Sequence, residues 1–592
     1  MSSYDMAIAI GGEAGQGIAT PGDILARLFV RRGLYFNSYN AFQSIVRGGH
    51  IFLTLRTTEE MKYSHGDKID LLLCLNQDTM DKHLHFMKAG SKVLYNSDKI
   101  TPGKAADGVQ LCGLPIADLT GNARAGLNQN TVAVGAILYL LGMEFQVLKD
   151  SLTQQFQRKG EAVVNENIKV AQAGFEHAIK QFEQFPDEIP MLEKPRGVWS
   201  GNDALAMGGA VAGVKFYAAY PMSPSTGVLH WFANNGRNIG AMVRQIEDEI
   251  GVANIVIGAA HTGARTLSAT SGGGFALMTE AIGAASMMEI PTVYIDVMRA
   301  GPSTGVPTKT EQGDLWQALG ASQGDFQRFI VAPIHAQDAF NLMPEIFNLT
   351  DRFQCPGIVL SDLLISEGHY SVDPDELDFF PAIERGVTIT EPAAGNTGYH
   401  RYKFTENGVS PRAVAGLEGY IHVVATDEHE ENSGLISDEF TNPHKRRAMV
   451  EKRSRKFENI VAEIAPPEII GPADADVTLI GWGSTFAAMH DALPLLADRG
   501  ITANFLSVKW IVPLHTERIA EVFANANHTI IVENNQSGQF ARYLRGETGL
   551  VPDGHIRKYD GEPFMPHHIA DGVEENLKNN TEQFIPFQEI VV

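Results

Sequence analysis

Short buried strands alternate with helical segments through the middle of this sequence, and this alternation constrains the fold more than any other feature. The apolar stretches KFYAAY (215–220), RTLSATS (265–271) and PTVYIDVM (291–298) are each preceded and followed by residues with helical spacing. Strands that alternate with helices form a mostly parallel sheet whose faces the helices cover. We therefore predict an α/β fold.

Polar and charged residues stand where the predicted strands end. Ser223, Ser271 and Arg299 lie at the ends of these three strands, and Glu249 lies at the end of a fourth, AMVRQIE (241–247). Ligands of parallel sheets bind at the carboxyl ends of the strands. The stretch 249–314 contains a carboxylate that opens a small-residue helix, a Gly-rich turn, and an arginine at a strand end. Residues 220–226 add a strand-to-helix turn. Together they predict a site for a flat organic cofactor and an anionic substrate.

The length of 592 residues predicts several domains of roughly 150 residues each. Three prolines between residues 186 and 197 interrupt the periodicity, so we expect a first boundary near residue 195. From about residue 370 to 472 the alternation of strands and helices becomes irregular. A further α/β unit begins after that.

A glycine-rich loop joins the first strand to the first helix and contains Gly12, Gly15 and Gly17. Such loops let backbone amides approach a phosphate at a helix N-terminus. However, the spacing is G-G-x-x-G-x-G, and the second strand ends in Tyr39-Asn40-Ala41, where a ribose-binding acid would stand. Three interpretations stay open: a packing turn, an NAD site, or a site for an anionic group such as the diphosphate of coenzyme A.

Composition excludes several classes of function. The 47 basic and 70 acidic residues give a net charge of −23, which disfavours nucleic-acid binding. No apolar run approaches ~18 residues and no export signal is visible, so we expect no membrane span and a cytoplasmic location. The three cysteines, Cys74, Cys112 and Cys355, are too few for an iron–sulfur cluster, which needs about four thiolates. No metal-binding spacing is present, and we predict no metal site on this chain.

Five motifs in order resemble those of the α subunit of 2-oxoacid:ferredoxin oxidoreductases. They are YPMSPST, GARTLSATSGGG, RAGPSTGVPTKTEQGDL, DEHEENSG, and GWGST followed by ENNQSGQ. The start GGEAGQGI resembles the γ domain of that family, fused at the N-terminus, an arrangement that is commonest in the 2-oxoglutarate type. The resemblance implies a Rossmann-like γ domain (1–190), a thiamine pyrimidine-binding domain (195–430), a linker helix (431–470) and a transketolase C-terminal-like domain (471–592).

The resemblance also implies roles for single residues. Glu249 would face the aminopyrimidine ring of thiamine diphosphate; alternatively, it is an acid favoured at a helix N-terminus by the helix dipole. Arg299 would bind the substrate carboxylate as a planar, bidentate donor, or would pair with Asp296. Ser223 would lie close to the substrate oxygen, or would cap a helix.

Further positions would surround the cofactor, namely Tyr220, Pro221, Ser271 and Gly272. Relatives often show Ser-Gly-Pro-Gly where this chain has Ser-Gly-Gly-Gly from Ser271, so the turn is expected to be looser. Arg265 and Thr270 are weaker candidates, expected to support the residues that contact the cofactor and substrate.

The chain contains no Gly-Asp-Gly motif, with which such enzymes hold the diphosphate and Mg²⁺. The resemblance therefore implies a partner β subunit that supplies the diphosphate site, Mg²⁺ and a [4Fe–4S] cluster, in an (αβ)2 assembly with ferredoxin as electron acceptor. The expected reaction is reversible oxidative decarboxylation of 2-oxoglutarate with coenzyme A to succinyl-CoA. The alternatives are the same chemistry on pyruvate, branched or aryl 2-oxoacids, and a non-catalytic assembly or binding subunit.

Two charged segments have no assigned role. The loop Asp427–Glu431 resembles a metal loop but is interpreted as a solvated motif, because alternation would split its side chains across two faces. The basic helix within 444–457 is interpreted as a solvated face. Alternatively, it would meet coenzyme A phosphates or the distal carboxylate of a dicarboxylic 2-oxoacid.

Overall fold

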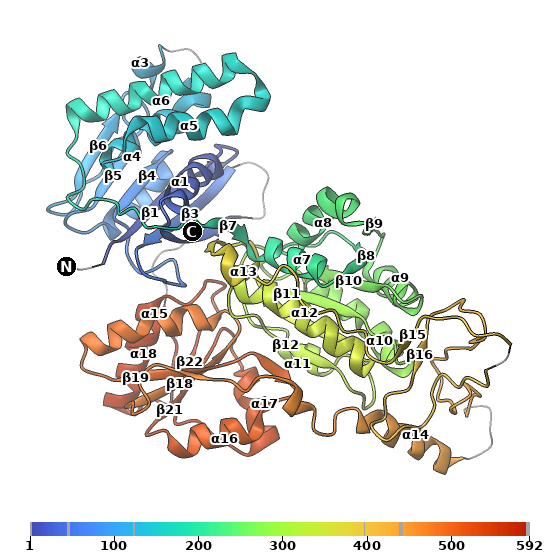
Figure 1. Cartoon of the computed structure of the whole chain (residues 1–592). Coiled ribbons are helices and arrows are strands. Elements are labelled where there is room, and N and C mark those ends of the chain that lie inside the picture. Colours follow the sequence, from blue (N-terminus) through green and yellow to red (C-terminus); the bar gives the residue numbers. More distant parts are fainter. Residues whose placement is uncertain (1–2, 44–47, 122–124, 396, 437–441, 588–592) are drawn as a thin grey trace.

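Three large sheets organise the chain in the computed structural model, which describes residues 3–43, 48–121, 125–395, 397–436 and 442–587 (Figure 1). They contain eight, seven and six strands, and helices pack on their faces. The predicted multi-domain α/β architecture is confirmed.

The first sheet is mixed rather than purely parallel. Strand β1 (Asp5–Ala14) pairs in parallel with β4 (Leu71–Cys74) and antiparallel with β3 (Gly48–Thr58). The chain passes from β1 through α1 (Ala19–Arg31) to β2 (Tyr35–Ala41), but β2 pairs antiparallel with β3. The first β-α-β segment is therefore not a parallel unit of adjacent strands. The other elements here are β5 (Lys92–Asn96), β6 (Gln110–Leu114), α2 (Gln77–His83), α3 (Ile116–Thr120), α4 (Ala125–Leu140), α5 (Phe145–Phe156) and α6 (Glu161–Gln181).

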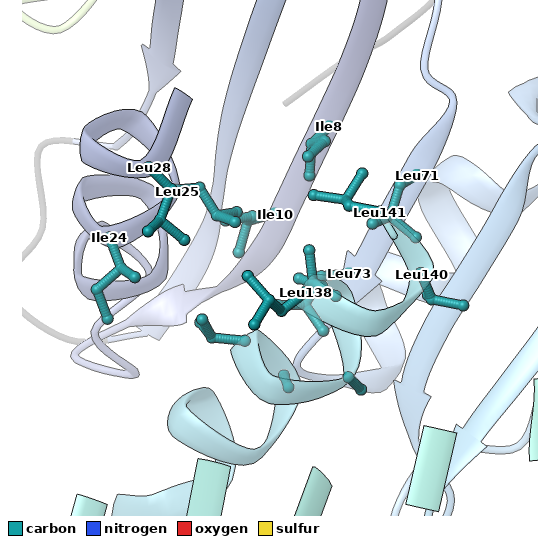
Figure 2. Close-up of a cluster of buried hydrophobic side chains, with 14 of the residues drawn as sticks. Ile8, Ile10, Ile24, Leu25, Leu28, Leu71, Leu73, Leu138, Leu140 and Leu141 are labelled. Carbon is teal, nitrogen blue, oxygen red and sulfur yellow. The ribbon is translucent and has the colours of Figure 1, made fainter. Parts of the chain in front are cut away.

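Apolar side chains from this sheet and its helices form one core, shown in Figure 2. The labelled residues of the core are Ile8, Ile10, Leu71 and Leu73 on the strands and Ile24, Leu25, Leu28, Leu138, Leu140 and Leu141 from the helical side. All are almost completely buried, and each such side chain stabilises the fold by roughly 1.5–3 kcal/mol. Side chains alternate between the two faces of a strand, so Ile8 and Ile10 on β1 both face the helices.

Six strands of the second sheet run parallel, as the sequence predicts, and lie in the order β12-β13-β11-β10-β8-β9. Its strands are β8 (Val214–Ala219), β9 (Met242–Gln245), β10 (Arg265–Thr270), β11 (Val293–Met298), β12 (Phe329–Val331) and β13 (Gly357–Asp362). Its helices are α7 (Gly201–Val211), α8 (Thr226–Ile239), α9 (Glu249–His261), α10 (Gly272–Met287), α11 (Leu315–Leu319), α12 (Ala336–Phe353) and α13 (Leu363–Glu367).

The third sheet follows the same principle, with the order β17-β19-β18-β21-β22-β23. Its strands are β17 (Ile469–Ile470), β18 (Val477–Trp482), β19 (Ala503–Val508), β21 (Thr529–Glu533), β22 (Gly554–Arg557) and β23 (Gln583–Phe584). Helices α15 (Thr485–Asp498), α16 (Thr516–Asn525), α17 (Gln539–Thr548) and α18 (Pro566–Asn579) pack around it.

Three strands lie in sheets other than those of their sequence neighbours. Strands β7 (Gly197–Ser200) and β14 (His369–Val372) extend the first sheet beyond β2. Strand β20 (Trp510–Val512) pairs antiparallel with β12 at the edge of the second sheet. Strands β7 and β14 follow the predicted boundary at 195 but belong to the first sheet, and β20 follows the boundary at 471 but belongs to the second. The domain limits therefore stay predictions.

A long irregular segment with β15 (Thr388–Ile389) and β16 (Arg412–Ala413) connects the second and third sheets and contains α14 (Pro443–Arg455). The interpretation of the basic segment 444–457 as a solvated face is wrong for three of its cations, which are buried. Lys452 is fully buried, and its Nζ lies 2.5 Å from Oε1 of Glu289. Lys456, one residue after the helix, places its Nζ 2.5 Å from the other oxygen of Glu289. Arg453 makes a two-pronged ion pair with Glu428.

The acidic loop Asp427–Glu431 is also not simply solvated. Glu428 accepts from Arg453 and Arg446, while the buried ring of His429 lies 3.7 Å, centroid to centroid, from that of Tyr402. Within the described ranges, no group of three His, Cys, Asp or Glu side chains could hold a metal ion. Ion pairs of Glu428 therefore fasten this loop to α14.

In the part of the chain that the structure describes, no helix combines the length and the apolar character needed to span a bilayer. The three cysteines are buried and unbonded to one another.

Candidate active site

The predicted site residues lie at the carboxyl edge of the second sheet. Ser223 lies in the turn between β8 and α8, Glu249 is the first residue of α9, and Arg299 follows β11. Strands β8, β10 and β11 are neighbours, and Thr270 stands beside Asp296 in the register. The fold thus brings these separate stretches of sequence to one edge.

Glu249 is buried, with 4% of its surface exposed. The N-cap of α9 is already provided by Asp248, whose Oδ1 accepts from the amide of Gly251 at 2.7 Å. Oε1 of Glu249 is buried and has no hydrogen-bond partner within the described residues. An acid that served only the helix dipole would stay in solvent, because an unpaired buried oxygen destabilises the fold. The burial of Glu249 therefore favours a ligand that donates a hydrogen bond.

The expected Gly-rich turn is wrong, because Gly272–Gly274 form the first turn of α10 itself. The glycines are needed for close approach. A Cβ at Gly274 would lie 2.2 Å from Oγ1 of Thr270 and 2.4 Å from Oε1 of Glu249. A Cβ at Gly272 would lie 2.4 Å from Oδ2 of Asp314. Two carboxyl groups therefore lie against the N-terminal turn of α10, where the helix dipole favours negative charge.

Gly274→Ala is expected to lower the thermal unfolding midpoint, because the added methyl group must displace Glu249 or Thr270, a change that costs about 1–3 kcal/mol. Gly273→Ala is the matched control, since its Cβ would meet only the Cε of Met222 at 3.8 Å. Alanine is also favoured over glycine in a helix by ~1 kcal/mol, so the control should be neutral or stabilised. Equal midpoints for the two variants would contradict this account of the site.

Arg299 is held from one side. Its Nη1 donates to the carbonyl oxygen of Ser223 at 2.7 Å, whereas the Ser223 side chain is exposed. Burial lowers the pKa of Arg299, and the nearby charges of Asp314 and Asp296 oppose that shift. No direct ion pair of Arg299 occurs in the described chain, so the alternative of a structural pair with Asp296 is not what the geometry shows.

Three acids in this part of the chain were not predicted as site residues, and the charges of two of them, Asp314 and Asp296, act to raise the pKa of Arg299. Asp296 is completely buried on β11, and burial raises its pKa well above the ordinary range. Burial also raises the pKa of Asp314 to about 6 and that of Glu311 to about 7. The signal in the sequence is an acid in the otherwise apolar strand VYIDVM, three residues before Arg299.

Some of the other predicted residues lie close to Glu249 and Arg299, and others lie far from them. Thr270 lies against Gly274, and Ser271 is the N-cap residue of α10 with its hydroxyl buried and unpaired among the described residues. Tyr220 and Pro221 are exposed at the same edge. Arg265 lies at the opposite end of β10, where its Nε contacts Oδ2 of Asp351 at 2.8 Å, so it does not reach the site.

The loop of Gly12, Gly15 and Gly17 lies between β1 and α1 in the first unit. Gly15 and Gly17 have φ of +98° and +71°, values that favour glycine. A Cβ at Gly12 would lie 2.8 Å from Oε1 of Gln16, which fits a packing turn, whereas a Cβ at Gly15 would meet open space. No side chain caps α1, but Pro21 has no N–H and the amide of Thr20 donates to the carbonyl oxygen of Gly17 at 3.2 Å, so the first turn offers few free amides to an anion.

Three segments match known protein families. Residues 7–177 match "Pyruvate ferredoxin/flavodoxin oxidoreductase", and residues 208–447 match "Pyruvate flavodoxin/ferredoxin oxidoreductase, thiamine diP-bdg". Residues 468–544 match "Transketolase, C-terminal domain".

Whole-chain similarity extends across this architecture. The α subunit of 2-oxoacid:ferredoxin oxidoreductase 2 of Aeropyrum pernix is 30% identical, over 98% of this chain and 99% of the relative. The 2-oxoglutarate oxidoreductase subunit KorA of Mycobacterium tuberculosis is 30% identical over 85% of this chain and 80% of its own. The solved 2-oxoglutarate:ferredoxin oxidoreductase of Magnetococcus marinus, with 2-oxoglutarate, coenzyme A and succinyl-CoA bound, matches with a TM-score of 0.90 and 29% identity. That match covers 98% of this chain and 100% of the other.

Proposed function

This chain belongs to the family of 2-oxoacid:ferredoxin oxidoreductase α subunits, thiamine diphosphate-dependent enzymes, and we propose that its substrate is 2-oxoglutarate. The reaction would convert 2-oxoglutarate and coenzyme A to succinyl-CoA and CO2, reversibly, with two electrons passing to ferredoxin. The names of two similar proteins support 2-oxoglutarate. Other relatives are named for 2-oxoacids in general, so pyruvate and branched or aryl 2-oxoacids are the competing substrates.

The observation that carries the catalytic proposal is the buried, unpaired Oε1 of Glu249. Thiamine diphosphate, when bound, supplies the carbon nucleophile and the electron sink for decarboxylation. Glu249 would accept a hydrogen bond from the pyrimidine ring and so hold a proton at that ring nitrogen. Ser271 and Gly272 at the start of α10, together with Tyr220 and Pro221 after β8, would line the same ring.

Arg299 would anchor the carboxylate of the 2-oxoacid. Its guanidinium is planar and offers paired donors, and the carbonyl oxygen of Ser223 fixes it from behind. The Ser223 side chain is exposed at the same turn and would donate to the keto oxygen of the substrate. These two residues would set the orientation of the substrate against the cofactor.

We propose that a β subunit completes the site. The pyrimidine half fits this chain, whereas no metal-binding cluster exists in the residues described and the sequence has no Gly-Asp-Gly motif. Ile250 on α9 and Leu277 on α10 are 52% and 49% exposed and line a groove of about 700 Å³. Ile255 on α9 is also exposed, at 38%. Exposed apolar side chains beside a half-built site favour a subunit interface. The partner would supply Mg²⁺, the diphosphate site and the [4Fe–4S] cluster, in an (αβ)2 assembly.

Coenzyme A would place its diphosphate at the loop of Gly12, Gly15 and Gly17. The open space at Gly15, where the loop backbone has no side chain above it, supports this assignment. The need for ferredoxin and coenzyme A supports a cytoplasmic location. We also keep the division into units 1–190, 195–430, 431–470 and 471–592 as our proposal for the domains.

The test is co-purification with the partner subunit, followed by viologen reduction with 2-oxoglutarate, pyruvate and 3-methyl-2-oxobutanoate, each with coenzyme A. We expect kcat/KM for 2-oxoglutarate to exceed the others by at least ~10-fold, the discrimination that one pocket provides. Equal values on pyruvate and 2-oxoglutarate would exclude the narrow specificity. The isolated chain should be inactive.

A further inference from the structure

The loop that follows Arg299 is closed by hydrogen bonds at its base. The amide of Ala300, the next residue, donates to the carbonyl oxygen of Lys309 at 3.0 Å. The amide of Val306 donates to the carbonyl oxygen of Ala300 at 2.9 Å. Residues 301–306 between these bonds are exposed, so they pack against little that could hold the loop. The backbone beside Arg299 is therefore tied to Lys309.

Lys309 is itself held by the segment between β22 and α18. Its Nζ forms an ion pair with Oε1 of Glu562, and the two side chains are only 14% and 10% exposed. The amide of Thr310, directly after Lys309, donates to the carbonyl oxygen of Gly561 at 3.0 Å. A Cβ at Gly561 would lie 2.9 Å from the Cβ of Lys309, so the two segments are in close contact. Side-chain and backbone bonds thus fasten the loop to the unit of the third sheet.

The same carboxylate binds a residue of the first sheet. The hydroxyl of Tyr39 on β2 donates to Oε2 of Glu562 at 2.7 Å, and both groups are buried. In a dinucleotide-binding unit, a ribose-binding acid would stand near this position of the sequence. Here the hydroxyl of Tyr39 is engaged by Glu562 instead. Glu562 therefore uses one oxygen for β2 and the other for the loop after Arg299.

The first and third sheets are also joined independently of Glu562. Nη1 of Arg56 on β3 lies 3.1 Å from Oδ2 of Asp491 on α15, and the hydroxyl of Ser64 donates to the same oxygen at 2.6 Å. These groups are buried as well. Glu562 differs from Asp491 because its second partner, Lys309, belongs to the loop beside the site. Hydrogen bonds on both oxygens fix the direction of the Glu562 carboxylate, and so the place of the Lys309 ammonium group.

We propose that Glu562 and Lys309 are positioning residues, which hold Arg299 where it binds the carboxylate of a 2-oxoacid, and that Tyr39 orients Glu562 from the first sheet. The inference rests on the proposed function, which assigns the substrate carboxylate to Arg299. The three residues act through the backbone bond between Ala300 and Lys309, not by contact with substrate. A side chain of the first sheet thereby contributes to the affinity of the second sheet for its anion.

The experiment measures viologen reduction by the assembled, cofactor-loaded complex with 2-oxoglutarate and coenzyme A. Tyr39→Phe removes one hydrogen bond and keeps the ring, which stacks on His65 with centroids 5.0 Å apart. We expect it to raise KM for 2-oxoglutarate about threefold, as the loss of one hydrogen bond allows. Lys309→Met also removes the ion pair and should raise KM about tenfold, whereas Lys309→Arg should restore it. KM for coenzyme A should stay unchanged throughout.

Tyr63→Phe is the matched control. Tyr63 also comes from the first unit, and its ring packs on that of Phe486 of α15 with centroids 4.9 Å apart. Its hydroxyl makes no hydrogen bond within the described residues, and its amide alone contacts Asp491. The substitution removes the same atom at the same contact between units but does not affect the loop. KM for 2-oxoglutarate should therefore equal that of the wild type.

The effect of Lys309→Met should disappear when Arg299 is absent, because a positioning residue acts only through the group that it positions. In the Arg299→Ala background, adding Lys309→Met should change KM for 2-oxoglutarate less than about twofold. A further tenfold rise there would overturn the proposal, because a general defect in folding or assembly would add to the loss of the arginine. Thermal midpoints and co-purification report whether each variant is folded and assembled. If Lys309→Met does not assemble, Tyr39→Phe decides.

Unchanged KM in Tyr39→Phe, or an equal rise in Tyr63→Phe, would also overturn the positioning role. Arg299→Ala separates this proposal from the proposed function. Wild-type KM in Arg299→Ala would reject the substrate anchor itself. A raised KM in Arg299→Ala, together with wild-type KM in Tyr39→Phe and Lys309→Met, would reject only the positioning by Glu562 and Lys309.

Discussion

Replacing Glu249 with alanine is expected to lower turnover of the assembled enzyme by about 10²- to 10⁴-fold, the range that a positioned acid–base group contributes. The physical reason is the buried Oε1, which has no partner in the described chain and which Gly274 leaves room for at the start of α10. The loss corresponds to roughly 3–5 kcal/mol of transition-state stabilisation. Viologen reduction with 2-oxoglutarate and coenzyme A, in the presence of the wild-type β subunit, measures it.

Glu247→Ala is the matched control, because Glu247 is an exposed acid two residues earlier, between β9 and α9. It should retain turnover close to that of the wild type. Co-purification with β and the thermal midpoint show whether the Glu249 variant still assembles. Near-normal turnover of an assembled Glu249→Ala enzyme would support the alternative of a non-catalytic assembly subunit.

The position of these residues at one edge of the sheet could be predicted because the signals for it are local in the sequence. Glu249 follows a short strand and opens a small-residue helix, and Arg299 follows an apolar run. In a parallel sheet such local positions determine the edge on which a residue lies. No contact between distant residues had to be known, so the strand ends could be assigned before the fold was seen.

Strand pairing, by contrast, depends on contacts that the pattern along one strand does not contain. Strand β2 follows β1 and α1 in the sequence, yet it pairs with β3. Strand β14, more than 300 positions further along the chain, pairs with β2 on its other side. The glycines after Ser271 were misjudged for a similar reason. They look like a turn until Asp314 and Glu249 are seen to require the space that side chains would fill.

The basic segment shows the same limit for charges. A run of lysines and arginines reads as a solvated face, but Lys452 meets Glu289 across 163 positions of sequence. Arg453 is likewise paired, with Glu428. Whether a cation is buried depends on which element packs over it. The sequence of α14 alone does not contain that information.

Glu289→Gln is expected to destabilise the protein by about 3–5 kcal/mol, because it leaves Lys452 and Lys456 buried without a counter-charge. Glu289 follows α10 and is completely buried, so water cannot replace the lost partner. The effect should appear as a lower midpoint of thermal unfolding of the protein. Glu280→Gln, a change at an exposed position on the preceding helix α10, should leave the midpoint nearly unchanged.

The destabilisation caused by Glu289→Gln is expected to become smaller as the pH falls. The two lysines hold the pKa of the Glu289 carboxyl well below its ordinary value of 4.5. A carboxyl group with a depressed folded-state pKa stabilises the fold above its unfolded-state pKa and loses that contribution as the pH falls. The difference in unfolding free energy between wild type and Glu289→Gln should therefore be full near pH 7 and shrink below about pH 4.5. A difference that grew on acidification, or equal midpoints at pH 7, would show that the ion pairs with α14 do not stabilise the protein.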